Sequence, residues 1–371
     1  MGQAMNLLRA WHYVEFLTPY EIKFKNKAAD VNYLRELTEL PWQSTDKYLD
    51  TGKHTYTHQV YVGVFPIREE LDFAREHFRE TEVRPDIEDH QGKTALAVIE
   101  INNDGKYIED SASISTMPFG LGQLNKGERY KDEWSTLFGK YKEEVKQIAS
   151  SHLKGSIDYK KLQLFLRELL ESSEWSPELI NPPFISFTYR HKKDRKSEKE
   201  DILNSFFIRD LEIVEKAHKS GESGNALNQY LKGTKGKVDI DENREKIERI
   251  LSPEHIPLAK WPSKDEYHLS MMQQLAVNSI FMKDTPHNNL YSVNGPPGTG
   301  KTTLLKDIMA ENVFQRAKRM VKFSDPNKAF THMKDIQVSE KFKVRVQNID
   351  DSIRGYGMVV ASSNNTAVEN I

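Results

Sequence analysis

The sequence predicts an α/β protein in two parts: an α+β region over residues 1–252, followed by the beginning of a parallel sheet over residues 253–371. Three observations support this prediction. In the first part, short runs of β-branched and aromatic residues alternate with helical patterns. In the second, a glycine-rich phosphate-binding pattern stands between an apolar run and a helical pattern. Near the boundary, residues 256–263 contain two prolines and are typical of a non-helical linker.

Composition limits the classes of function. The 371 residues suffice for about two or three domains, and a net charge of −2 gives no overall basic field, so any nucleic-acid site must be local. The chain has no cysteine, which excludes disulfides, cysteine zinc sites and a thiol nucleophile and agrees with a reducing compartment. No apolar run approaches the roughly 18–20 residues that span a bilayer, and residues 1–6 lack a signal-peptide pattern. We therefore expect a soluble cytoplasmic protein with no membrane partner.

The first part is expected to form a small sheet covered by helices. Extended patterns predict its strands at residues 58–65, 94–101 and 184–189, with a hairpin turn at residues 102–105. Helical patterns occur at residues 7–17, 67–80, 130–180 and from residue 202 onward. No chemistry follows from these patterns, so the role of residues 1–252 stays open.

Two polar segments of the first part could be functional sites or simply solvated loops. Asp86, Glu88, Asp89 and His90 could hold a metal ion, although a solvated charged loop is the commoner explanation of such a cluster. Residues 190–196 are strongly basic and could touch phosphates, but acidic residues follow at once, which again favours a solvated loop.

The second part contains a complete phosphate-binding P-loop pattern, G-x-x-x-x-G-K-[ST]. Its residues, with their neighbours, are Asn294, Gly295, Pro296, Pro297, Gly298, Thr299, Gly300, Lys301, Thr302 and Thr303. The context fits, because residues 290–293 are typical of a strand and residues 304–310 of a helix with one apolar face. A glycine-rich turn without a ligand is the plain alternative, and the Lys-Thr pair with both correct flanks argues against it.

The residue types of this loop suit a bound triphosphate. Glycines let the backbone approach phosphate oxygens closely, and N–H groups at a helix start can surround an anion. Lys301 would place a compact positive charge beside the β- and γ-phosphates, and the Thr302 hydroxyl is positioned to ligate Mg²⁺. Thr303 is expected to be structural, in the first helical turn. Lys301 and Thr302 are therefore the candidate catalytic residues.

A second motif precedes the loop. Residues 269–280 predict a helix that begins with a serine cap and carries Gln273 about twenty residues before the P-loop. This pattern resembles the adenine-recognising Q motif of helicases. A glutamine amide offers both a donor and an acceptor, so it can pair with the N6 and N7 edge of adenine. The resemblance implies that the nucleotide is ATP.

A third motif follows the loop. Residues 357–361 predict a buried strand that runs into Ser363, Asn364 and Asn365 and then into a helix start. The segment resembles motif Ia of superfamily 1 helicases, in which this turn holds the backbone of single-stranded nucleic acid, DNA or RNA. Short polar side chains suit contacts to phosphate and sugar that carry no sequence preference. An asparagine-rich helix cap is the alternative interpretation.

Together, residues from about 250 to 371 resemble the start of the first RecA-like motor domain of superfamily 1B helicases. The resemblance is to large bacterial helicase-like proteins grouped with the nonsense-mediated-decay and Okazaki-processing helicases. Residues 324–330 lie in an insertion of the kind that the bacterial subgroup carries, and the first 250 residues resemble the leading region of those proteins. The resemblance implies an ATP-dependent helicase or translocase that uses Mg²⁺.

The chain also departs from that family. Only the three motifs are present, and no apolar strand ending in Asp-Glu follows the P-loop. A second RecA-like domain and an arginine finger are missing as well. We therefore expect a fragment or a truncated reading frame that binds nucleotide weakly or not at all and hydrolyses it very poorly. An AAA+ ATPase, whose P-loop has the same form, and a non-catalytic module that recruits partners remain alternatives.

The motifs also predict an arrangement in space. Residues 290–293 and 358–361 should be parallel neighbours in one sheet, with the P-loop helix as the right-handed crossover between them. Such a crossover needs only about 10–12 residues, so residues 320–355 should fold outside the core sheet. Within them, residues 341–346 predict an extra strand or arm.

Overall fold

The computed structural model separates into two compact units, Met1–Ser223 and Gly224–Ile371. The residues that it describes are 2–24, 29–44, 47–48, 50, 53–78, 91–127, 133–192, 202–233, 242–261, 268–282, 290–296, 298–339 and 342–362. Every helix among these residues is too short or too polar to traverse a lipid bilayer.

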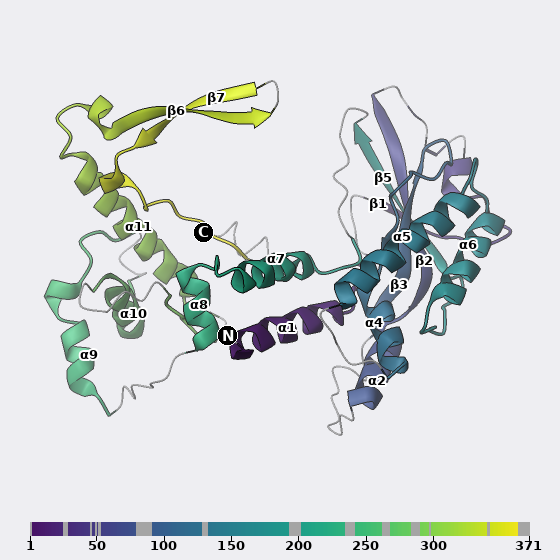
Figure 1. Cartoon of the computed structure of the whole chain (residues 1–371), viewed down its shortest axis with the longest axis horizontal. Helices are drawn as coiled ribbons and strands as arrows, with labels where there is room; N and C mark the ends of the chain where they lie inside the picture. The colour runs from purple at the N-terminus through teal and green to yellow at the C-terminus, as the bar shows by residue number, and fades with distance from the viewer. Residues whose placement is uncertain are drawn as a thin grey trace. The chain divides into compact units, whose positions relative to one another are not determined.

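The first unit is built on a five-stranded antiparallel sheet with the strand order β1-β5-β2-β3-β4 (Figure 1). Its strands are β1 (Ala29–Tyr33), β2 (His54–Pro66), β3 (Lys93–Asn102), β4 (Ser113–Ile114) and β5 (Phe184–Lys192). β2 is the central strand and pairs along most of its length with β3 and β5. The mixed α/β character and the three strands expected in this region are confirmed.

Six α-helices accompany this sheet among the described residues of the unit. They are α1 (Gly2–Phe16), α2 (Ile67–Phe78), α4 (Thr116–Asn125), α5 (Trp134–His152), α6 (Tyr159–Ser172) and α7 (Phe207–Lys219). The main core joins one face of the sheet to α4, α5 and α6 and includes Phe16, Trp134 and Phe165 (Figure 1). A smaller cluster around Tyr61 and Phe187 covers the other face. Because both faces are covered, residues 60–65 of β2 are buried without alternation.

Local chemistry explains one agreement and one difference in this unit. The expected turn after β3 is present, since Gly105 N donates to Asn102 O at 3.0 Å and the Asn102 side chain accepts from Lys106 N at 2.9 Å. The helix expected from residue 202 begins only at Phe207. Asn204 explains the delay: its amide donates to Ile114 O and accepts from Thr116 N, at 2.8 and 2.7 Å, which fixes the preceding turn against β4 and α4. Residues 86–90 and 193–196 lie outside the described residues.

The second unit holds four α-helices and one hairpin among its described residues. The helices are α8 (Asn225–Lys232), α9 (Arg244–Ile250), α10 (Met271–Phe281) and α11 (Lys301–Met320). Strands β6 (Phe330–Ser339) and β7 (Phe342–Ile349) pair with each other as a separate two-stranded antiparallel sheet beyond the end of α11 (Figure 1). The strand or arm expected at residues 341–346 therefore corresponds to β7.

The expected parallel pair on either side of the P-loop helix is not formed. Residues 290–293 and 358–361 are all described, and neither segment is a strand. Their apolar side chains are solvent-exposed, to 43% at Val293 and 95% at Val359. Parallel strands need neighbours in the ladder and cover on both faces, and the described part of this unit supplies neither to these segments. The prediction of this strand pair was wrong for the structure described here.

Candidate functional site: the P-loop and the residues that hold it

The P-loop turns into α11 through two glycines with left-handed backbone. Gly298 has φ 81°, and Gly300, the N-cap of α11, has φ 74° and ψ 29°. The turn is closed by Thr299, whose hydroxyl donates to Pro296 O at 2.8 Å, and Leu304 N donates back to Gly300 O at 3.2 Å. Free N–H groups remain in the first turn of any helix, so the end of this loop is a place where an anion is favoured.

Lys301 lies folded over the loop that precedes it. Its ammonium donates to Gly295 O at 2.6 Å and to Pro296 O at 2.9 Å, while the side chain stays exposed. Two carbonyl oxygens thus hold the positive charge at the mouth of the loop, close to the positive end of the α11 dipole. The Lys301 ammonium and the first turn of α11 therefore lie together at this end of the loop.

Thr302 and Thr303 occupy the first turn of α11. Thr302 is exposed, so its hydroxyl is accessible to a ligand or a metal ion, whereas Thr303 is partly buried. Pro297 and the motif Ia residues Ser363, Asn364 and Asn365 lie outside the described residues. The structure therefore brings together the loop, Lys301, Thr302 and, as follows, Gln273.

Gln273 connects the start of α10 to the P-loop. Ser270 caps α10 as expected, and Gln273 completes a capping box in which its Oε1 accepts from Ser270 N at 2.8 Å. Its Nε2 donates to Thr299 O at 2.8 Å and to Gly300 O at 3.4 Å. The side chain predicted to contact a base thus contacts the backbone of the loop in this structure.

Two buried carboxylates on α11 hold the segment that the sequence marked as a linker. Asp307 Oδ1 accepts from Trp261 N and Glu311 Oε2 accepts from Ala259 N, both at 2.9 Å. Asp307 is only 8% exposed and Glu311 only 3%. The two acids are one helical turn apart, so they bind alternate N–H groups of an extended strap. We use the term strap for residues 256–261 below.

Sequence reasoning overlooked this strap contact, although a signal was present. Asp307 and Glu311 fall on the same side of α11 as the buried Leu304, at the spacing of an apolar stripe. Acidic residues at such core positions are rarely buried unless they have partners. Their position alone therefore indicated that they accept hydrogen bonds.

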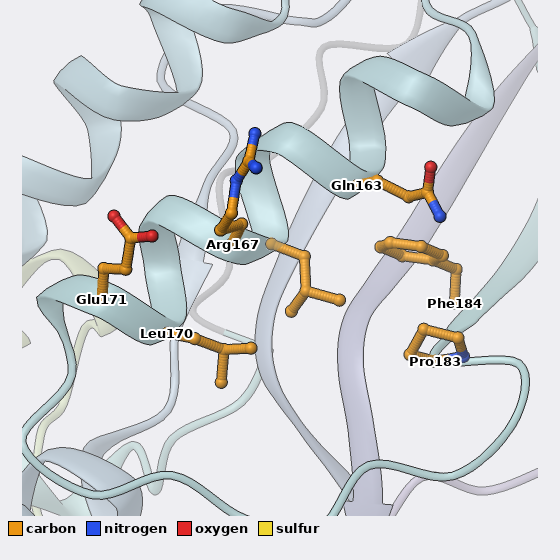
Figure 2. A pocket seen from close by; sticks show the side chains of 7 residues that line it. Gln163, Arg167, Leu170, Glu171, Pro183 and Phe184 are labelled. Carbon is orange, nitrogen blue, oxygen red and sulfur yellow. The ribbon is translucent and has the colours of Figure 1, made fainter.

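A concavity lies on the first unit, between α6 and the start of β5. It has a volume of about 410 Å³ and an apolar floor that includes Leu166, Leu170 and Phe184. Figure 2 shows Leu170 with the exposed side chains of Arg167 and Glu171 on one side of the groove and Pro183 with Phe184 on the other.

Across the described ranges, histidines and carboxylates nowhere gather in threes in a way that could hold a metal ion. The candidate cluster at residues 86–90 lies outside those ranges.

Comparison with known proteins adds no relative. The chain matches no protein-family model, no curated protein and no solved structure. Its candidate function consequently depends on the P-loop geometry and the motifs.

Proposed function

We propose that the second unit binds the triphosphate of a nucleotide with Mg²⁺, as the first part of a RecA-like motor of an ATP-dependent superfamily 1 helicase or translocase. The observation that carries the proposal is the P-loop itself. Left-handed glycines close it onto the first turn of α11, and the Lys301 ammonium lies at its mouth. This combination is what a dense anionic ligand requires.

Different groups of the loop would bind different parts of the triphosphate and its Mg²⁺. Phosphate oxygens are stronger acceptors for an ammonium than the neutral carbonyls of Gly295 and Pro296, so a bound triphosphate would draw Lys301 away from them. Backbone N–H groups of the loop and of the first α11 turn would satisfy further oxygens. Mg²⁺, when bound, neutralises phosphate charge, and Thr302 would contribute one ligand to it.

The helicase part of the proposal depends on the sequence motifs. Ser363, Asn364 and Asn365 would contact the backbone of single-stranded DNA or RNA, and Gln273 occupies the register of the adenine-recognising Q motif. Turnover by these 371 residues should be weak, because no apolar run ending in Asp-Glu follows the P-loop in the sequence. Two alternatives remain: an AAA+ ATPase and a non-catalytic module that recruits partners.

Nucleotide binding tests the proposal directly. Titration of the whole chain with a fluorescent ATP analogue and Mg²⁺ should give saturable binding, and Lys301→Ala should weaken it at least tenfold. Lys306→Ala is the matched control, because Lys306 lies on the same helix one turn beyond the loop and should leave affinity unchanged. Equal binding by wild type and Lys301→Ala would contradict the proposal.

Phosphate release separates the motor from the alternatives. It should be measured for the same proteins with and without a single-stranded oligonucleotide. Stimulation by the oligonucleotide that Lys301→Ala abolishes would support a motor whose site is more complete than the sequence indicates. Nucleotide binding without any turnover would favour the non-catalytic module.

A further inference from the structure

Both the nitrogen and the oxygen of the Gln273 side-chain amide form hydrogen bonds. Nε2 donates to the carbonyls of Thr299 and Gly300, at 2.8 and 3.4 Å. Oε1 accepts from Ser270 N at 2.8 Å. A primary amide has two N–H donors and one oxygen with two acceptor positions. The two donors are therefore directed at the P-loop, and a single acceptor position is left.

The orientation of the amide follows from its partners. Ser270 N–H can only donate and the Thr299 carbonyl can only accept, so the oxygen must face Ser270 and the nitrogen must face Thr299. Turning the amide over would place two donors together at Ser270 and two acceptors together at Thr299. The arrangement is thus fixed by two independent contacts at opposite ends of the same group.

Space around Gly300 shows how closely the amide fits the loop. A Cβ atom at residue 300 would collide with Gln273 Nε2. The side chain thus packs directly on the glycine that starts α11, at the junction where phosphate-binding N–H groups begin. Gln273 is placed to fix the position of that junction.

Recognition of a base would require the Gln273 amide to direct its hydrogen bonds at the base and not at the loop. Recognition of adenine through N6 and N7 needs one acceptor and one donor from the amide. The acceptor position is available, but both donors are committed to Thr299 and Gly300. Contact with N7 would therefore require Gln273 to release the loop that holds the phosphates.

We infer that Gln273 is a positioning residue for the phosphate-binding loop and does not discriminate between bases. The inference depends on the proposed nucleotide binding, and it assigns Gln273 to the binding of the triphosphate. Removing the amide should weaken binding of every ligand that carries a triphosphate, whatever base is attached to it.

The test compares three probes that share a triphosphate: ATP, GTP and inorganic tripolyphosphate, each titrated calorimetrically with Mg²⁺ into the whole chain. Gln273→Ala should lower the affinity for all three by a similar factor, about fivefold for the loss of hydrogen bonds to the loop. Gln273→Glu keeps an acceptor for Ser270 N but loses the donors, so it should lose affinity for all three as well. Gln274→Ala is the control, since Gln274 contacts Asn278 and Lys260 and not the loop.

The outcomes distinguish the inference from the function on which it depends. Loss confined to ATP in Gln273→Ala, with GTP and tripolyphosphate unaffected, would show base reading and overturn the inference. Unchanged affinity for all three probes would overturn it as well. Failure of the wild type to bind any of them would instead defeat the proposed function. Circular dichroism would check the fold of each variant, and the cap from Ser270 Oγ to Gln273 N survives these substitutions because it uses the backbone.

Discussion

At residue 300 the backbone is left-handed, and a side chain there would meet both torsional and steric resistance. The φ of 74° disfavours any residue with a Cβ by roughly 1–2 kcal/mol. The added carbon would also displace the Gln273 amide from the loop. Gly300→Ala should therefore lower the free energy of unfolding of the second unit and weaken triphosphate binding together, as measured by urea unfolding and calorimetry.

Gly357→Ala is the matched control for that change. Gly357 belongs to the same unit, has no left-handed φ, and has no atom within 4 Å of the place where a Cβ would stand. It should leave both measurements within error of the wild type. A neutral effect of Gly300→Ala would mean that the loop can rearrange without loss.

His58 makes the stability of the first unit depend on pH. The ring is fully buried in β2, with Nδ1 2.9 Å from Thr188 Oγ1, and burial lowers its pKa from 6.5 to about 4. The folded state therefore keeps the ring neutral, whereas the unfolded chain takes up a proton below about pH 6.5. The stability from the neutral ring is complete above pH 6.5 and is lost as the pH falls to about 4. The loss is on the order of 3 kcal/mol.

Comparison with His58→Asn isolates this contribution, because asparagine keeps a polar group for Thr188 and does not titrate. As the pH falls from 7 to 4, the unfolding free energy of the wild type should decrease relative to that of the variant. A difference independent of pH would contradict the assignment. Glu70 must be left intact, because burial raises its carboxyl pKa well above 4.5 and gives a dependence of the opposite sign: stability is lost as the pH rises.

At the scale of elements, the strap can be tested through its acceptors on α11. Glu311→Ala leaves the half-buried Ala259 N without its partner and should reduce the unfolding free energy of the second unit by about 1–2 kcal/mol. Glu311→Gln retains an acceptor oxygen and should cost clearly less. Denaturant unfolding of the three proteins checks this. Equal stability of wild type and Glu311→Ala would mean that the strap contributes nothing.

Local signals predicted the elements well where a residue's role depends on its neighbours in sequence. The Ser270 cap, the turn after β3 and the start of α11 at the P-loop all belong to this class. The start of α7 was placed too early, because the role of Asn204 depends on Ile114 and Thr116, some ninety residues away. Residues 290–293 have a strand pattern and no ladder partner, and a pattern cannot supply one.

The candidate site was predicted in part for the same reason. Glycines, Lys301 and Thr302 are recognisable at fixed spacing, so the loop could be found from the sequence. The Gln273 contact with the loop could not, because a glutamine at that register is equally compatible with a base or with a carbonyl. The partners of Asp307 and Glu311, which are the N–H groups of Trp261 and Ala259, became visible only with the strap in place.

At the scale of the whole molecule, the division at Ser223 gives the first unit a complete sheet and both of its apolar clusters. A fragment of residues 1–223 should therefore fold alone and unfold in one cooperative transition. Near-ultraviolet circular dichroism during thermal unfolding would show this, with the whole chain as reference. A fragment that lacks a cooperative transition would mean that residues after 223 complete its core.

The contacts of α11 have a mechanical consequence. The helix begins at Lys301 and holds the strap at Asp307 and Glu311. In its second half it contacts Tyr356, because Asn312 donates to Tyr356 O at 3.3 Å and Arg319 lies 5.9 Å from the Tyr356 ring centre. An α-helix is stiff along its axis and rises about 1.5 Å per residue, so Lys301 and Arg319 are ends of a rod about 27 Å long. A ligand that shifted the first turn by one ångström would displace the strap and Tyr356 by nearly as much. The helix therefore couples the P-loop mechanically to the strap and to Tyr356.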